Sequence, residues 1–382
     1  MHFPFRDRFI GEHKSYADNT PHVTGNTLDC SLGVNPYGFP QEVLQVKDSY
    51  DWAHLLDYPH SHQLHDALCA YWPGVNAKQI TLANGSICGL YYLCNIFAGA
   101  PRTKVVGFVP TFTDMIESVK TFGMHYHGVS VRLEENGKAC ADDLIAAIDE
   151  DTALVYVDRP NNPTGQTRPL SDMRRILEAA RAKGAYVLAD EAYGDFIPKD
   201  EASLALWGEY DNLIVAKTFS KGFGLANLRC GYVVAPEELT GYMARTLNPY
   251  VTSDLNRAIC AEALQYPQHP VAHGEDFAVA KTGLRAVIGQ RVTMLETDDR
   301  VPICTLALQE DGDLQALLMQ QDVLTVSGAE FDALGKRYVR LRIPLNDQVN
   351  RLIEAFAMGL YGVLCLGIKK SPFACQDVED DL

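Results

Sequence analysis

The sequence has 382 residues, of which 47% are hydrophobic and 21% charged, and its formal net charge is −16. This length permits a large core and two domains, and the composition is that of an ordinary globular protein. The acidic balance argues against nucleic acid or an anionic membrane as the main partner, because both bind basic surfaces. A small anion can still be held in a local basic pocket, so we expect small-molecule partners.

Targeting signals are not evident in the sequence. Residues 1–20 are mixed and polar, unlike a secretory leader, and the longest apolar run near the end, residues 359–368, is too short to cross a bilayer. The ten cysteines include no Cys-x-x-Cys pair, so we interpret them as reduced, buried thiols and not as a disulfide framework. These features predict a cytoplasmic protein without membrane association.

Strand-like and helix-like patterns alternate from about residue 64 onward. Short continuous apolar runs, which are typical of strands buried on both faces, occupy residues 79–83, 104–109, 153–158, 185–190, 213–218 and 230–235. Helical patterns occupy residues 84–98, 111–123 and 170–184. In the last of these, Ser171 is the expected N-terminal cap and Gly184 the expected stop. The alternation predicts an α/β fold with a mostly parallel central sheet covered by helices, and ligands at the carboxyl ends of its strands.

The two ends of the chain differ from this pattern. Residues 1–45 are rich in loops, and beyond about residue 262 long helical patterns precede strands at 302–308 and 337–345 and a helix at 348–364. We therefore predict a large domain over residues 46–261. Residues 1–45 and 262–382 would form a smaller, discontinuous α+β domain, with an N-terminal arm and a flexible C-terminal tail.

Polar side chains follow several of the predicted strands. Asn162 lies in "RPNNPTGQ", Asp190 in "LADEAYGDF" and Lys221 in "TFSKGFG". Taken singly, each motif also suits an ordinary loop, and "NGS" at residues 84–86 is only a weak phosphate signal. Asp190 is less easily explained as an ordinary loop residue, because a carboxylate at the end of a buried strand needs a partner. A phosphate cradle, a buried acid, a lysine and an arginine at one sheet edge together describe a site for pyridoxal 5′-phosphate (PLP).

The order and spacing of these motifs resemble one enzyme family over roughly residues 28–360. The chain resembles the class I/II aminotransferases among the fold-type I PLP-dependent enzymes, and within them the histidinol-phosphate aminotransferase-like branch. The motifs that carry the resemblance are "NPYG" (35–38), "YP" (58–59), "NGS" (84–86), "PTF" (110–112), "NNPTG" (161–165), "DEAY" (190–193), "TFSKGFGLANLR" (218–229) and "RLRI" (340–343).

The resemblance implies a role for each residue around the cofactor ring. Lys221 would form a Schiff base with the cofactor aldehyde and move the substrate proton. Asp190 would keep the pyridine nitrogen protonated, which makes the ring an electron sink. Asn162 and Tyr193 would bind the ring 3′-oxygen, and Phe112 would stack on the ring.

The resemblance also implies how the phosphate is held. The binding groups would be the backbone at Gly85, Ser86 and Ile87, the hydroxyls of Thr218 and Ser220, and the guanidinium of Arg229. Tyr58 resembles the family tyrosine that reaches the phosphate of the neighbouring subunit. The chain would then act as a homodimer with shared active sites; Tyr58 could instead simply anchor a loop.

The substrate side of the site is implied by three residues. Arg342 matches the family arginine that receives the substrate carboxylate, and Arg340 is the alternative because it lies two residues earlier on the same strand face. Asn35 lies in the segment that usually lines the substrate pocket. The histidines at 60, 62 and 65 are most simply part of a polar loop and helix start, so we predict no metal site.

Three functions remain open at this point. The leading hypothesis is a PLP-dependent aminotransferase that moves an amino group between an amino acid, or an amino-phosphate such as histidinol phosphate, and a 2-oxo acid. The second is a decarboxylase similar to threonine-phosphate decarboxylase, whose N-terminal stretch residues 28–36 also resemble. The third is a PLP-binding regulator without turnover. Arg159, Gly222 and Asn227 depart from the usual family pattern, and this leaves the substrate open more than the cofactor.

Overall fold

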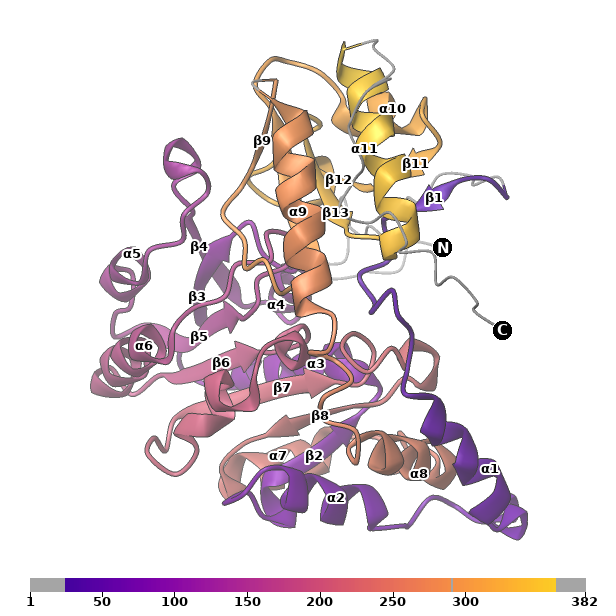
Figure 1. Ribbon diagram of the computed structural model, residues 1–382. Helices are drawn as coiled ribbons and strands as arrows, with labels where there is room; N and C mark the ends of the chain where they lie inside the picture. The colour runs from indigo at the N-terminus through magenta and orange to yellow at the C-terminus, as the bar shows by residue number, and fades with distance from the viewer. Residues whose placement is uncertain (1–24, 290, 362–382) are drawn as a thin grey trace, which may run out of the picture.

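The computed structural model describes residues 25–289 and 291–361, and its centre is a seven-stranded sheet (Figure 1). The strand order is β2-β8-β7-β6-β5-β3-β4. The strands are β2 (Ile80–Ala83), β3 (Lys104–Val109), β4 (His125–Ser130), β5 (Thr152–Asp158), β6 (Tyr186–Asp190), β7 (Leu213–Thr218) and β8 (Gly231–Val234). Strand β8 is antiparallel to both of its neighbours, and the other pairs are parallel. The expected mostly parallel α/β sheet is confirmed.

Helices cover both faces of this sheet, and this explains why its strands read as continuous apolar runs. Alternate residues of β5 face opposite sides: Val155 packs in one core cluster and Leu154 in another. The helices of this part of the chain are α1 (Val46–Ser49), α2 (Gln63–Tyr71), α3 (Gly85–Ala98), α4 (Thr113–Thr121), α5 (Ala141–Ala146), α6 (Leu170–Ala182), α7 (Glu237–Thr246) and α8 (Asp254–Ala263).

A second, antiparallel sheet is built mainly from the later part of the chain. Its order is β12-β13-β10-β9, and helices α9 (Gly274–Ile288), α10 (Leu314–Met319) and α11 (Asn346–Tyr361) pack beside it. The strands are β9 (Val292–Met294), β10 (Ile303–Leu308), β12 (Val326–Ser327) and β13 (Tyr338–Arg342). Near the N-terminus, β1 (Leu28–Asp29) pairs with β11 (Val323–Leu324) of the same region. The domain boundaries proposed from the sequence stay a prediction. Residues 1–20, for which no secretory leader was predicted, and the predicted flexible C-terminal tail lie outside the described residues.

The start of helix α6 and the edge strand β4 differ from what the sequence predicted. Helix α6 begins at Leu170 with Pro169 at the N-cap position, so the prediction that Ser171 caps this helix was wrong. Proline suits this place because its fixed φ is compatible with entry to a helix and it has no N–H to satisfy. The edge strand β4 was not expected, because its sequence "HYHGVS" has no apolar run and is largely exposed.

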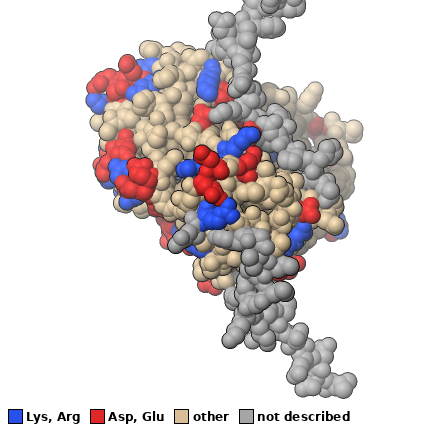
Figure 2. Space-filling view, turned by 90° about the horizontal axis from the view of Figure 1, so that it is seen from above, with Lys and Arg blue, Asp and Glu red and all other residues tan. Residues whose placement is uncertain are grey.

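One face of the molecule shows how its charged groups are distributed. On the face seen from above in Figure 1, acidic and basic side chains lie interspersed among uncharged residues (Figure 2). Within residues 25–289 and 291–361, no helix is both long and apolar enough to span a bilayer.

The second sheet rests on the carboxyl end of β5. The Thr305 hydroxyl donates to the Pro163 carbonyl at 3.0 Å, and the Asp298 amide donates to the Gly165 carbonyl, also at 3.0 Å. An ion pair between Arg300 and Glu201, at 2.7 Å, adds a further link. These contacts place β10 and its neighbour β13 directly beside the loop that carries Asn162.

A buried ion network joins the segments behind the strand ends. Arg159 lies 3.1 Å from Glu191, which lies 3.2 Å from Lys217, and Lys217 lies 3.0 Å from Asp195. Arg159, Glu191 and Lys217 are buried, the Asp195 side chain is 8% exposed, and the network contains two positive and two negative groups. Burial opposes ionisation of Glu191, but the charges of Lys217 and Arg159 lower its pKa. The network therefore ties the loops after β5 and β6 to β7.

Glu191→Gln is expected to destabilise the protein by about 3–5 kcal/mol, because Arg159 and Lys217 would keep buried charges without their shared partner. The measurement is the free energy of unfolding in urea. The control is Asp299→Asn in the ion pair with Arg285, whose side chains are 38% and 40% exposed; its expected effect is below about 1 kcal/mol. Equal, small losses in both variants would contradict a structural role for the network.

Candidate cofactor site

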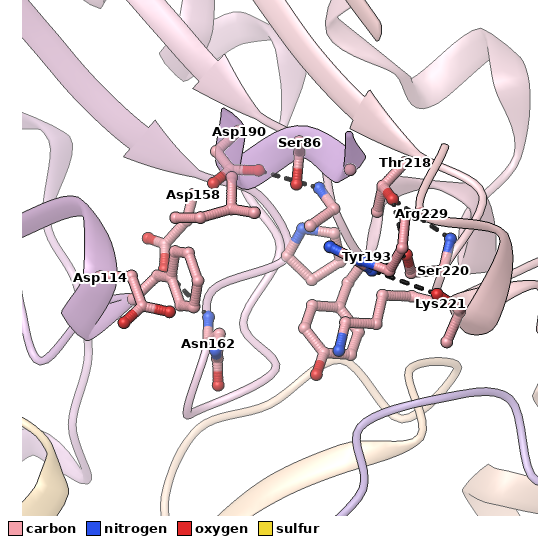
Figure 3. Close-up of a pocket in the computed structure, with 16 residues that line it drawn as sticks. Ser86, Asp114, Asp158, Asn162, Asp190, Tyr193, Thr218, Ser220, Lys221 and Arg229 are labelled. Carbon is pink, nitrogen blue, oxygen red and sulfur yellow. Dashed lines mark hydrogen bonds between the residues drawn. The ribbon is translucent and has the colours of Figure 1, made fainter. Parts of the chain in front are cut away.

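One pocket lies where the carboxyl ends of β5, β6 and β7 meet the start of α3 (Figure 3). It brings together eleven of the residues singled out in the sequence. These are Gly85, Ser86, Ile87, Phe112, Asn162, Asp190, Tyr193, Thr218, Ser220, Lys221 and Arg229. The pocket is also lined by residues that the sequence reasoning missed: Asp114, Asp158, Pro160, Ala192 and Ala226. For Asp158 a signal existed, since it ends the strand next to the one that ends at Asp190.

Asp190 forms the acidic end of the pocket. It is the last residue of β6 and is 3% exposed. The Tyr156 hydroxyl donates to its Oδ2 at 2.9 Å, and the Ala192 amide donates to its Oδ1 at 3.1 Å. Burial raises the pKa of Asp190 to about 7, and the negative charge of Asp158 contributes to the rise. A cationic group bound against Asp190 would restore its ionised form.

The opposite end of the pocket is an anion cradle. Gly85 opens α3 at φ +73°, and a Cβ atom there would lie 2.6 Å from Nη2 of Arg229. The first turn of a helix presents free N–H groups and the positive end of its dipole. Glycine thus leaves room for the guanidinium beside the start of α3.

Hydroxyl groups complete this cradle. Thr218 Oγ1 lies 2.9 Å from Ser220 Oγ, and Arg229 Nη1 lies 3.4 Å from the same oxygen. Arg229 itself has φ 50°, in the left-handed region that is costly for a residue with a side chain. The guanidinium donates from Nη2 to the Asn84 carbonyl at 3.4 Å, just before the start of α3.

Lys221 and Tyr193 lie between the two ends. Lys221 Nζ is 5.6 Å from the centre of the Tyr193 ring. Burial raises the pKa of Tyr193, and Arg340 and Arg342 act in the opposite direction. The Tyr193 hydroxyl is buried without a hydrogen-bond partner among the described residues. A polar atom in that position fits a ligand oxygen.

Asn35 supports the lysine segment and does not line the pocket. Its backbone N–H donates to the Lys221 carbonyl at 3.0 Å, and its side-chain amide donates to the Gly222 carbonyl at 2.9 Å. Its side-chain oxygen accepts the Tyr37 amide at 3.0 Å. The expected contact of Asn35 with substrate stays a prediction.

The two candidate arginines of β13 lie differently. Arg340 is 2% exposed and donates from Nη1 to Asn162 Oδ1 at 2.9 Å and from Nη2 to the Ser31 carbonyl at 2.6 Å. Arg342 donates to the carbonyls of Asp29 and Ile343. Arg340 is therefore the arginine that contacts a residue of the pocket wall.

Tyr58 lies outside this pocket. Its side chain is 73% exposed, and its ring stacks on that of Tyr250 with centroids 4.5 Å apart. Within one chain it does not reach the anion cradle, so its expected contact with a neighbouring subunit stays a prediction.

The pocket residues fit pyridoxal 5′-phosphate. Asp190 is a buried acid that suits a protonated ring nitrogen, the unpartnered Tyr193 hydroxyl suits the ring oxygen, and the cradle formed at Gly85 with Arg229 suits the phosphate. Lys221 stands between them with an amine that can bind the aldehyde. Each chemical feature of the cofactor has a matching group.

Gly85→Ala is expected to weaken binding of pyridoxal 5′-phosphate by at least tenfold, because the added methyl group would displace Arg229. The measurement is titration of the visible absorbance of the bound cofactor. The control is Gly74→Ala, where φ is +90° but no atom lies within 4 Å of the added Cβ. Both variants carry a backbone strain of about 1–2 kcal/mol, so the same affinity in both would contradict the cradle.

Comparisons with known proteins agree with this site. The family described as "Aminotransferase class I and II" matches residues 29–356. The histidinol-phosphate aminotransferase of Pyrococcus furiosus is 30% identical over 242 residues, which are 61% of this chain and 66% of the relative. That of Cronobacter sakazakii is 37% identical over 51% of this chain and 53% of the relative. The chain thus spans less than two thirds of the length of these curated relatives.

Solved structures show the same fold. A histidinol-phosphate aminotransferase from Clostridium acetobutylicum aligns with a TM-score of 0.78 at 19% identity, covering 86% of this chain and 98% of the other. An aspartate aminotransferase from Thermus thermophilus aligns with a TM-score of 0.76 at 19% identity, covering 87% and 92%. The chain belongs to the class I and II aminotransferase family, whose cofactor is pyridoxal 5′-phosphate.

Proposed function

We propose that the protein is a PLP-dependent aminotransferase. It would move an amino group between an amino acid, or a phosphorylated amine such as histidinol phosphate, and a 2-oxo acid. The observation that carries this proposal is the convergence of Lys221, Asp190 and Asn162 on one pocket, with Arg340 hydrogen-bonded to Asn162 at its wall. When bound, the cofactor supplies an electron sink for the charge that develops at the substrate Cα.

The residues of the chain then have separate tasks. Asp190 would hold the proton at the ring nitrogen, and the Gly85–Arg229 cradle, which lines the same pocket, would anchor the phosphate. Lys221 Nζ would hold the cofactor, and its amine could carry a proton to or from the substrate Cα. Tyr193 and Asn162 orient the ring through its oxygen.

The Asn162–Arg340 pair supports transamination over decarboxylation. The Arg340 fork is buried and held by Asn162 and by the Ser31 carbonyl, so it can bind a carboxylate in a defined plane. A carboxylate that is held in this way does not leave, and cleavage of the Cα–H bond is favoured instead. We therefore assign the substrate carboxylate to Arg340; Arg342 was the first choice from the sequence.

We also infer a homodimer that works in the cytoplasm. Several apolar side chains are exposed together in one short segment: Trp52 (51%), Leu55 (64%), Leu56 (92%) and Tyr58 (73%). A contiguous exposed apolar segment of this kind supports contact with another chain, and Tyr58 would supply a group to the partner's site. The eight cysteines of the described residues carry free thiols, which suits a reducing compartment.

Lys221→Ala is expected to abolish turnover, because among the described residues no second lysine lines the pocket to hold the cofactor or carry the proton. The test follows the visible absorbance of the bound cofactor in half-reactions. In the unaltered protein an amino donor should bleach this absorbance and a 2-oxo acid should restore it. Lys336→Ala, an exposed lysine in a pair with Asp313, is the control. Release of carbon dioxide without bleaching would support the decarboxylase, and no response to any donor would support the regulator.

Arg340→Lys is expected to raise KM for carboxylate substrates about 100-fold, since a lysine cannot reproduce the bidentate fork. Arg342→Lys is the matched control on the same strand, and we expect less than a tenfold change in KM. The measurement is steady-state kinetics with a single amino donor at several concentrations. The reverse order of the two effects would return the carboxylate to Arg342.

A further inference from the structure

Asp158 is a buried acid of the pocket that the proposed reaction does not use. It ends β5 in direct register with Asp190 at the end of β6. Residues in register on neighbouring parallel strands lie about 4.8 Å apart and point to the same face. Both side chains line the same pocket (Figure 3). Two carboxylates therefore stand side by side at the pocket floor.

The hydrogen bonds of Asp158 differ from those of Asp190. The Asn161 side-chain amide donates to its two oxygens at 2.9 and 3.0 Å, and the Asn162 backbone N–H donates to it at 3.0 Å. These donors favour the ionised carboxylate. They also fix the turn from which Asn162 reaches Arg340.

The groups around Asp158 are mostly acidic or neutral. Burial and the nearby acids raise the pKa values of Tyr156 and Tyr126, so both phenols stay neutral. The guanidinium of Arg168 also interacts with Asp158, but it is bonded to the Ala139 carbonyl. Lys221 and Arg229, which are cations of the pocket, both lie in the connection between β7 and β8.

Asp158 and Asp190 therefore differ in pKa. Burial raises the pKa of Asp158 to about 6, although its hydrogen bonds with Asn161 and Asn162 act against the rise. The pKa of Asp190 is higher, at about 7, and the charge of Asp158 contributes to it. As a coupled pair, they place the exchangeable proton mainly on Asp190 near neutral pH.

We propose that Asp158 is a fixed anion of the cofactor site that reinforces the negative field at Asp190 and holds the turn that presents Asn162. This inference rests on the cofactor site of the proposed function. A cationic group bound against Asp190 gains from both charges, because screening by water is weak in a buried site. The division resembles other carboxylate pairs in which environment assigns two roles to one residue type.

The test compares Asp158→Asn with the unaltered protein in two measurements. The first is the affinity for pyridoxal 5′-phosphate at pH 8, where both acids of the native pair are ionised; we expect a loss of about tenfold, equivalent to one pKa unit. The second is thermal stability without cofactor between pH 4 and 8. Acids with raised pKa values stabilise the fold below their unfolded pKa and lose this contribution as pH rises through about 6 and 7. The variant should lose less stability over this range.

The matched control is Asp149→Asn, which lies before β5 at its other end and pairs with Lys104 at 2.6 Å. Lys104 lowers the pKa of Asp149 to about 2, so its stability contribution is lost only as pH falls below about 4. This variant should keep the native cofactor affinity and the native slope between pH 4 and 8.

Unchanged cofactor affinity together with an unchanged pH slope in Asp158→Asn would overturn the proposal. If that variant fails to fold, Asp158→Ser is measured in its place, and a flat native profile between pH 4 and 8 would contradict the acid pair by itself. Neither readout requires turnover. A protein that binds the cofactor but does not transaminate would therefore refute the proposed function and leave this inference standing.

Discussion

The parallel, in-register pairing of β5, β6 and β7 is the constraint on which the site depends. It brings the carboxyl ends of three strands to one edge, so that these ends and the segments after them deliver Asn162, Asp190 and Lys221 to a single pocket. Behind this edge, the buried network centred on Glu191 ties the same segments together. A shift of one residue in any of these pairings would turn the acids away from the pocket.

The electrostatics of the pocket follow from this geometry. At one end, burial makes ionisation of the acids unfavourable without a positive partner, so a cationic ligand is favoured there. At the other end, the start of α3 and Arg229 favour an anion. Pyridoxal 5′-phosphate has both charges, one on its ring nitrogen and one on its phosphate. Arg340 then connects the second sheet to this pocket through Asn162.

Much of this arrangement could be predicted from the sequence, for physical reasons. Strands β3 and β7 match the predicted bounds, because burial on both faces leaves an unbroken apolar run. Strand β4 lacks such a run, since it lies at an exposed edge. The choice between Arg340 and Arg342 could not be made from the strand pattern, because both residues point to one face and only their contacts differ. Asp158 was not predicted as a pocket residue for a similar reason, because its place in the pocket depends on its pairing in register with Asp190.

The central claim is that the amine of Lys221 binds the cofactor in the pocket that Asp190 also lines. The direct measurement is reduction of the cofactor-loaded protein with borohydride, followed by digestion and mass spectrometry of the peptides. The account predicts a pyridoxyl group on Lys221 in the peptide that contains "TFSKGFG". A protein that takes up no pyridoxyl group, or carries it mainly on another lysine, would contradict the account.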